Sequence, residues 1–151
     1  MCVRNRMGRR CGTIVGVQPT RPPVPFAPWG PDGPPVLHDG DGLETVAGPL
    51  PLDVPCPRCE SPVRVDVTRL LAAAALDPGA VVSEALGLTV REPLPGMRVV
   101  VDPLGLQVFA LPQDCPCGTA FEVVAGYGEY QPARWVATFL GVAPAHAPRR
   151  S

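Results

Sequence analysis

The pattern of apolar and polar positions predicts short strands in the part of the chain that follows residue 55. VRVDV (63–67) alternates apolar and polar residues in the manner of a half-buried strand. RVVVD (98–102) and LQVFAL (106–111) are joined through a DPLG sequence that suits a type I turn, so a β-hairpin is expected there. Two further strands are predicted over FEVVA (121–125) and ARWVATFL (133–140), the second of which is also compatible with a helix.

A helical insertion is predicted between the first strand and the hairpin. RLLAAAAL (69–76) predicts a short helix capped by Thr68. Asp77-Pro78-Gly79 ends this helix and begins a second one, which runs to about Leu86 with Gly87 as its C-cap. The expected fold class is α+β, with a small, mainly antiparallel sheet.

Two cysteine pairs lie on either side of this insertion. Cys56 and Cys59 belong to CPRC, Cys115 and Cys117 belong to DCPCG, and a strand follows each pair. Proline within each pair predicts a tight turn whose sulfur atoms point to one spot. Zinc prefers four tetrahedral ligands, and two such turns supply them. The long chain between the pairs is no obstacle, because the cost of closing a loop grows only logarithmically with its length. We therefore predict a structural zinc ion.

CPRC and CPCG, each followed by a strand, resemble the turns of the zinc-ribbon group and those of the bacterial CpXC domain. The resemblance covers these two turns and their strands, and it implies a four-cysteine zinc site. The second turn is one residue shorter than the usual CPxC, so its half of the site is expected to be distorted. The group includes nucleic-acid binders, enzyme subunits and scaffolds, so the resemblance assigns no function.

Two other interpretations of the cysteines stay open. A redox dithiol also uses CxxC, but its first cysteine is activated at a helix N-terminus, whereas Glu60-Ser61-Pro62 leads into a strand. In the other interpretation, the four thiols are unpaired or serve a different purpose. Cys2 and Cys11 match no ligand spacing and are interpreted as incidental thiols.

The N-terminal part is rich in proline. Prolines recur every third residue at positions 22, 25, 28, 31 and 34, which is the period of a polyproline II helix. The same period places Phe26 and Trp29 on one adjacent ridge, where they can anchor the arm on a partner or on the body itself; the alternative is a flexible spacer. We predict an extended arm over 1–55, a zinc-stabilised domain over 56–141 and a flexible tail over 142–151.

Charge separates the beginning of the chain from the rest. Residues 1–21 carry five arginines and no acidic residue, and residues 22–55 carry five acidic residues and no basic one. Binding of nucleic acid through the first of these segments is an alternative function, although short charged termini are usually solvated. The four arginines proposed for that contact are Arg4, Arg6, Arg9 and Arg10.

The composition indicates where the protein works. No apolar run is long enough for a membrane span, and the first residues lack the apolar core of a secretory leader, so we expect a cytoplasmic protein. The chain has no lysine and is rich in Ala, Pro and Gly, which suggests the GC-rich genome of a bacterium or phage.

Candidate catalytic groups are scarce. LHDGDGLE (37–44) superficially resembles a calcium loop but lacks that loop's length and ligand order. Two histidines and no serine nucleophile motif provide no convincing general base or nucleophile. We therefore predict a non-catalytic, zinc-stabilised binding or assembly component that docks on a protein partner. Nucleic-acid binding and a redox dithiol enzyme are the alternatives.

Overall fold

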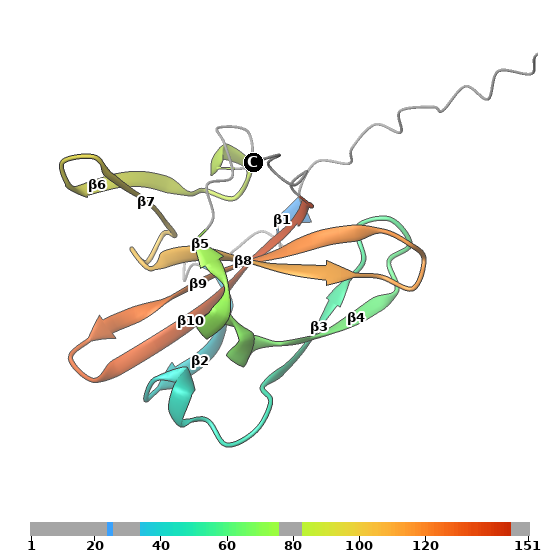
Figure 1. Ribbon diagram of the computed structural model, residues 1–151, viewed down its shortest axis with the longest axis horizontal. Coiled ribbons are helices and arrows are strands. Elements are labelled where there is room, and N and C mark those ends of the chain that lie inside the picture. The colour runs from blue at the N-terminus through green and yellow to red at the C-terminus, as the bar shows by residue number, and fades with distance from the viewer. Residues whose placement is uncertain (1–23, 26–33, 76–82, 146–151) are drawn as a thin grey trace, which may run out of the picture.

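A computed structural model describes residues 24–25, 34–75 and 83–145 of the chain. Most strands join one antiparallel sheet in the order β1-β10-β9-β8-β7-β6; β2 also pairs with β10, and β5 with β8 (Figure 1). A separate two-stranded sheet contains β3 and β4. The strands are β1 Val24–Pro25, β2 Val36–Gly40, β3 Pro51–Pro55, β4 Pro62–Asp66, β5 Ala74–Ala75, β6 Thr89–Leu94, β7 Met97–Val101, β8 Gln107–Asp114, β9 Ala120–Gln131 and β10 Arg134–Pro144.

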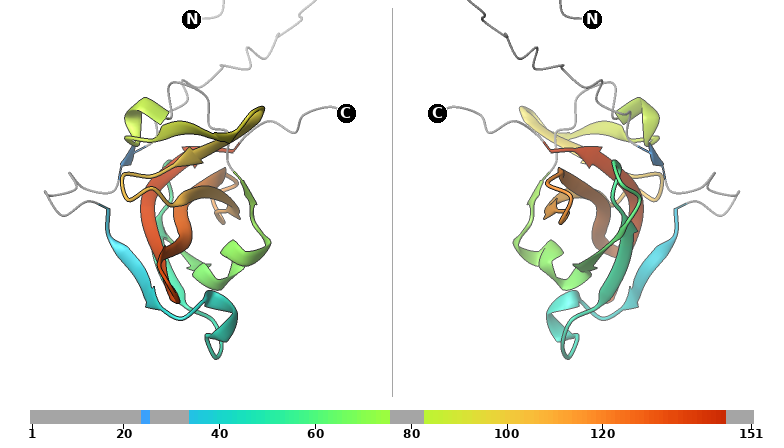
Figure 2. Two further views of the ribbon diagram at one scale, coloured as in Figure 1. Left: turned by 90° about the vertical axis from the view of Figure 1, so that its left-hand side faces the viewer. Right: turned by 90° about the vertical axis from the view of Figure 1, so that its right-hand side faces the viewer.

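The described residues thus form a small, mainly antiparallel domain with few helices, as expected. Two short 3-10 helices, η1 (Leu43–Thr45) and η2 (Val67–Ala72), accompany the strands. Figure 2 shows from two opposite sides that the long strands β9 and β10 are strongly curved. No described helix is long and apolar enough to cross a membrane.

Strands β8, β9 and β10 are the centre of the sheet, and both of its faces are covered. One face packs against η1, η2 and the β3–β4 hairpin through a core that includes Leu43, Val65 and Phe121. The other face packs against a smaller cluster that includes Leu86 and Val108. Strands buried on both faces have nearly continuous apolar sequences. This explains why the predicted segment 133–140, all of which except Ala133 lies in β10, is also compatible with a helix.

The predicted hairpin around DPLG is present as β7 and β8. Gly105 N–H donates to the Asp102 carbonyl at 2.9 Å, and Gly105 has a φ of 83°. This arrangement matches a three-residue loop whose last residue is left-handed, a conformation that glycine adopts without steric cost.

The first predicted helix is wrong in type and extent. The chain forms the 3-10 helix η2 over 67–72 and then the short strand β5, so a helix does not extend to residue 76. The cap is Asp66 instead of Thr68: Asp66 Oδ1 accepts hydrogen bonds from Thr68 N–H and Leu50 N–H, both at 3.0 Å. One carboxylate therefore starts η2 and closes the base of the β3–β4 hairpin. The Thr68 hydroxyl lowers the pKa of Asp66 most, and the two backbone hydrogen bonds lower it further.

The end of the second predicted helix is confirmed, whereas its start lies outside the described residues. Residues 83–85 are helical, and Gly87 has a φ of 65°. Gly87 N–H donates to the Glu84 carbonyl at 3.2 Å, and Leu88 N–H donates to the Ser83 carbonyl at 2.7 Å. These two bonds form a Schellman motif, for which the left-handed residue is usually glycine.

The boundary between arm and body lies earlier than residue 55. Residues 36–55 form β2, η1 and β3, and Leu43 is 1% exposed in the larger core. At the other end of the chain, β10 continues to Pro144, so 142–144 belong to the sheet and not to a tail. These segments are held by pairing with distant strands, as in Val136↔Asp39, and local patterns of apolar residues do not reveal such pairing.

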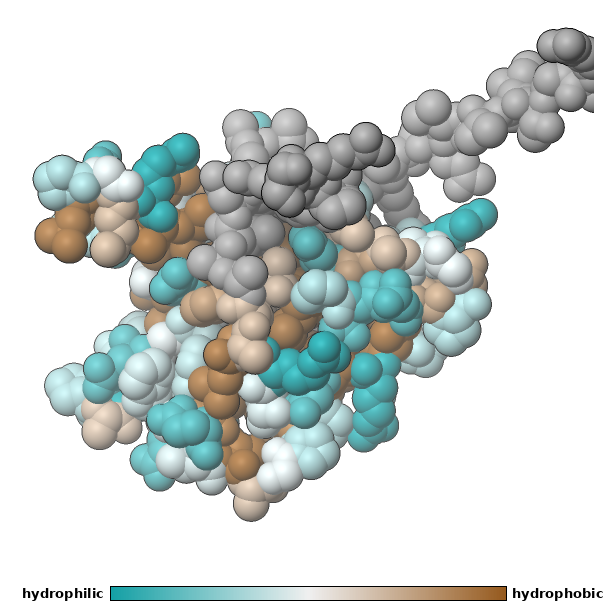
Figure 3. Space-filling view, viewed as in Figure 1, coloured by the Kyte–Doolittle hydropathy of each residue, from teal (hydrophilic) through white to brown (hydrophobic). Residues whose placement is uncertain are grey.

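The β6–β7 hairpin projects from the body (Figure 1), and its apolar side chains are visible at the upper left of Figure 3. Val90, Leu94 and Met97 are all exposed. β6 is an edge strand, and Pro93 removes one of its backbone donors. Proline and charged residues on an edge strand discourage pairing with another sheet.

A buried carboxylate links the β7–β8 turn to the centre of the sheet. Asp102 is 2% exposed; its Oδ1 accepts bonds from Leu104 N–H and Leu106 N–H, both at 2.9 Å. Its Oδ2 accepts a 2.7 Å bond from the Thr138 hydroxyl, so both oxygen atoms of this buried side chain have hydrogen-bond partners. The carboxylate lies over Gly126, where an added Cβ would be 2.5 Å from both Asp102 Oδ2 and Thr138 Oγ1.

We expect Gly126→Ala to destabilise the protein by about 1–3 kcal/mol, because the methyl group forces this hydrogen-bonded pair apart. Gly128→Ala is the matched control, since its Cβ would meet only Leu106 Cδ2 at an ordinary 3.7 Å. Urea unfolding followed by circular dichroism measures both variants. Equal stability of the two would contradict the close approach at Gly126.

Candidate metal centre

The two cysteine pairs occupy the tips of two hairpins that belong to different sheets. Pro55 and Pro62 are the last paired residues of β3 and β4, and Cys56 and Cys59 lie in the turn between them. Asp114 and Ala120 are the last paired residues of β8 and β9, and Cys115 and Cys117 lie in that turn. The expectation that separate hairpins bring the pairs together is therefore confirmed.

The two turns share one hydrogen-bond pattern, and the second turn is shorter by one residue. In the first, Glu60 N–H donates to the Cys56 carbonyl and Cys56 N–H donates to the Ser61 carbonyl, both at 2.9 Å. In the second, Gly118 N–H donates to the Cys115 carbonyl at 2.8 Å and Cys115 N–H donates to the Thr119 carbonyl at 2.9 Å. The shorter turn thus tightens the same loop.

The residue after the second cysteine of each turn is left-handed. Glu60 has a φ of 63° and Gly118 a φ of 85°. For residues other than glycine, this conformation costs roughly 1–2 kcal/mol. The first turn therefore contains a strained glutamate at the position where the second has a glycine.

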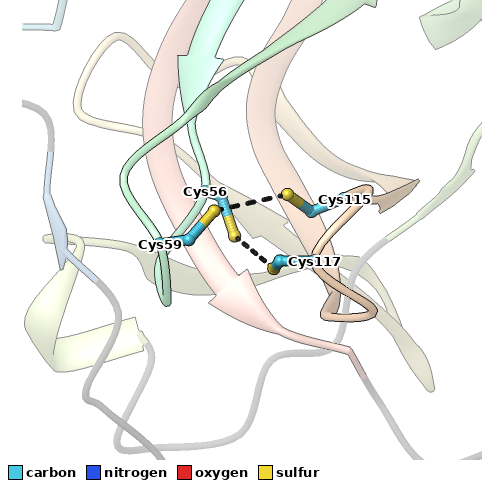
Figure 4. Close-up of side chains that lie close together, drawn as sticks. All are labelled: Cys56, Cys59, Cys115 and Cys117. Carbon is cyan, nitrogen blue, oxygen red and sulfur yellow. Dashed lines mark hydrogen bonds between the residues drawn. The ribbon is translucent and has the colours of Figure 1, made fainter.

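All four sulfur atoms lie within 4.8 Å of one another, and Figure 4 shows the side chains converging from the two turns. The Sγ atoms of Cys59 and Cys115 are 3.5 Å apart, and those of Cys56 and Cys117 are 3.8 Å apart. A tetrahedral zinc site with Zn–S bonds of about 2.3 Å has sulfur–sulfur edges of about 3.8 Å. The cluster is therefore close to the size that a single ion requires.

The cluster combines buried and exposed thiols. Cys56 and Cys115 are buried, at 1% and 5% exposure, whereas Cys59 and Cys117 are exposed. The buried pair holds the site against the core, and the exposed pair leaves an approach from solvent.

Hydrogen bonds give the thiols different proton affinities. The Thr119 hydroxyl, followed by the Cys115 thiol, lowers the pKa of Cys117 to about 6. The Ser61 hydroxyl lowers the pKa of Cys59. The Cys117 backbone lowers the pKa of Cys115, but burial and the neighbouring thiols outweigh this effect and raise it to about 12. Because a metal binds thiolates, loading this site releases protons.

Ser61 and Thr119 are site residues that sequence reasoning missed. Each is two positions after the second cysteine of its turn, and the Cys117 thiol lies 3.3 Å from Thr119 Oγ1. A hydroxyl residue at this spacing in both turns is a signal that the sequence contained.

The other residues singled out from the sequence are not brought to this site. Phe26, Trp29, Cys2, Cys11 and the four arginines of the nucleic-acid hypothesis lie outside the described residues. In the LHDGDGLE segment, Asp39 forms two hydrogen bonds with the Arg134 guanidinium, which lowers the pKa of Asp39. The His38 Nε2 atom lies 2.6 Å from the Asp41 carbonyl. These contacts hold β2 and its turn in place.

No protein-family model, curated protein or solved structure matches the chain. The resemblance to zinc-ribbon and CpXC turns is therefore not supported by a family match. The geometry of the four cysteines is compatible with binding of a metal ion.

We expect Gly118→Ala to weaken metal binding, because alanine at this φ strains the turn that positions Cys115 and Cys117 by about 1–2 kcal/mol. Gly48→Ala is the matched control: Gly48 has nearly the same φ, 86°, and open space around it, but lies outside the cysteine turns. Competition with a chromogenic chelator measures affinity. An equal affinity for metal in both variants would show that the conformation of Gly118 does not matter to the site.

Proposed function

We propose that the four cysteines hold one structural zinc ion and that the protein is a non-catalytic binding or assembly component. The observation that supports this proposal is the convergence of four thiols, two from each hairpin tip, within 4.8 Å. Four sulfur ligands in a tetrahedral arrangement suit zinc or an iron–sulfur cluster. All four sulfur atoms lie within 4.8 Å of one another, and this close spacing favours a single ion over a cluster of several iron atoms.

The donor set also favours a structural role. A catalytic zinc ion has three protein ligands and an open position for water, whereas four thiolates complete the coordination. The ion would connect the β3–β4 hairpin to the tip of the β8–β9 hairpin. An isolated two-stranded hairpin is marginally stable in water, so this connection would contribute strongly to holding β3 and β4 in place.

We expect the purified protein to contain one equivalent of zinc by elemental analysis and to show no absorbance of an iron–sulfur cluster. Cys59→Ser should lose the metal and lower the melting temperature, because an exposed thiolate ligand is removed without a change in the core. Cys11→Ser, the matched control, should keep both. Zinc-free wild-type protein, or full zinc content in Cys59→Ser, would contradict the proposed site.

The proline-rich segment provides the second part of the proposed function, docking on a protein partner through Phe26 and Trp29. Two aromatic side chains at a spacing of three lie side by side on a polyproline II helix, and burying both contributes several kcal/mol before ordering costs. Support comes from β1, where Val24 and Pro25 pair with Val142 and Gly141, so the backbone just before Phe26 lies against the body.

We expect Phe26→Ala with Trp29→Ala to weaken co-purification of the native partner while zinc content stays unchanged, because the docking rings are lost and the cysteines are not. The control is Val36→Ala, which also removes an exposed apolar side chain but lies in β2. Pull-down from the native host with tagged full-length chain measures the difference. An unchanged set of bound proteins would contradict docking through these two side chains and would show that the segment is only a spacer.

A further inference from the structure

Each exposed thiol of the cysteine site has a buried thiol of the other hairpin as a close neighbour. The Sγ atom of Cys59, which is exposed, lies 3.5 Å from that of Cys115, which is buried. The Sγ atom of Cys117, which is exposed, lies 3.8 Å from that of Cys56, which is buried. Figure 4 marks these two contacts, and both join the β3–β4 turn to the β8–β9 turn. Each contact thus pairs one accessible thiol with one protected thiol across the two hairpins.

Both contacts are short enough for a disulfide to form with a small movement. Bonded sulfur atoms lie about 2.05 Å apart, so from 3.5 and 3.8 Å the two sulfurs of each pair must approach by roughly 1.5–1.8 Å. Rotation of the cysteine side chains about their Cα–Cβ bonds supplies a movement of this size. The backbone hydrogen bonds of both turns can stay in place meanwhile, because they do not involve sulfur atoms.

A disulfide within one turn is less favourable, above all in the second turn. Cys115 and Cys117 are separated by Pro116 alone, and proline fixes its own φ. This limits how far the backbone of the turn can adjust to join its own two sulfur atoms. A bond between the hairpins instead uses sulfur atoms that are already in contact.

Hydroperoxides are the class of oxidant that suits a pair of one exposed and one buried thiol. The exposed thiolate attacks one peroxide oxygen, the O–O bond breaks, and the products are a sulfenic acid and hydroxide or an alkoxide. The buried thiol then attacks the sulfenic sulfur, the S–S bond forms, and the S–O bond breaks with release of water. Each disulfide thus consumes one hydroperoxide, which is reduced by the two electrons that the two sulfur atoms lose.

We propose that hydroperoxides oxidise the site to two disulfides between the hairpins, Cys59–Cys115 and Cys56–Cys117. The exposed Cys59 and Cys117 are oxidised first, and the buried Cys115 and Cys56 resolve them. This inference goes beyond the proposed function, since the disulfides form whether or not the site held an ion beforehand. An ion held by four thiolates leaves when they are oxidised, because the thiolate is the metal ligand.

The two disulfides would replace the connection that an ion makes between the hairpins. They join residues that are 56 and 61 positions apart in the chain, whereas disulfides within the turns would join near neighbours. A disulfide that closes a long loop restricts the unfolded chain more than one that closes a short loop. Oxidation therefore releases the ion without releasing the β3–β4 hairpin.

Peptide mapping of the oxidised protein tests the pairing. The full-length chain with Cys2→Ser and Cys11→Ser is treated with a chelator and hydrogen peroxide, alkylated and digested with trypsin. Cleavage after Arg58 separates Cys56 from Cys59. We expect one product in which peptides 11–58, 59–64 and 99–134 are all linked. Peptide 59–64 linked to 11–58 alone would show a disulfide within the first turn and would overturn the proposal.

Three double variants that all keep Cys59 identify its partner. Cys56→Ser with Cys117→Ser leaves Cys115 as the resolving thiol, Cys115→Ser with Cys117→Ser leaves Cys56, and Cys56→Ser with Cys115→Ser leaves Cys117. The variants are matched, because each lacks two of the four metal ligands and each keeps the thiol that is oxidised first. We expect trapping of the Cys59 sulfenic acid by dimedone to be about tenfold lower in the first variant, since a neighbour in contact has a high effective concentration. Equal trapping in all three would contradict the assignment of Cys115.

Zinc release and stability separate this inference from the proposed function. Peroxide should release bound zinc from the protein as purified, which a chromogenic chelator detects. The oxidised product should unfold at a higher urea concentration than the reduced, metal-free protein, because the disulfides tie the hairpins together; an equal midpoint would contradict that role. A zinc-free protein that forms the three-peptide product would refute the metal site alone. A zinc-loaded protein whose two turns oxidise separately would refute the disulfides between the hairpins alone.

Discussion

The β3–β4 hairpin and the main sheet share no strand pairing among the described residues, so side chains alone hold the two together. Val54, Val63 and Val65 supply apolar contacts, each worth about 1.5–3 kcal/mol when fully buried. The cysteine turns supply the other connection, at the point where both hairpins reverse. A structural zinc ion contributes roughly 10–16 kcal/mol in small zinc-dependent peptides, which exceeds what a few valines provide. The convergence of the two cysteine turns is therefore the constraint on which the position of this hairpin depends.

The sequence predicted the parts of this arrangement that depend on local chemistry. The strand predicted at 63–67 and found as β4 at 62–66, the DPLG hairpin, the glycine at the end of the 83–85 helical turn and the two cysteine turns each have a signal within a few residues. The alternation of Val63, Val65 and Val67 is such a signal, because it reports one buried face. Proline beside each cysteine pair is another, because it predicts a turn at a definite place.

The missed parts depend on partners that are far away in the chain. Residues 34–55 looked like a continuation of the arm, yet Leu43 is buried beneath Tyr127, 84 positions later. The alanine-rich run at 69–76 favours a helix locally, but Asp66 starts a tighter helix and Ala74 and Ala75 pair with β8. A distortion was expected in the shorter CPC turn. The turn instead keeps the backbone hydrogen-bond pattern of the first turn with one residue fewer. Sequence spacing alone could not show that, because it does not specify which carbonyl accepts.

The cysteine site and η2 are connected in series through the chain. Cys59 precedes the segment that becomes β4, and Asp66 ends β4 and caps η2. Asp66 also accepts a hydrogen bond from the N–H of Leu50, next to β3, so one carboxylate ties the hairpin to η2. Strands β8, β9 and β10 have a second core on their far face and the Asp102–Thr138 hydrogen bond, neither of which involves the cysteine turns. The cysteine site is therefore placed to fix the hairpin and η2, whereas the central sheet has contacts of its own.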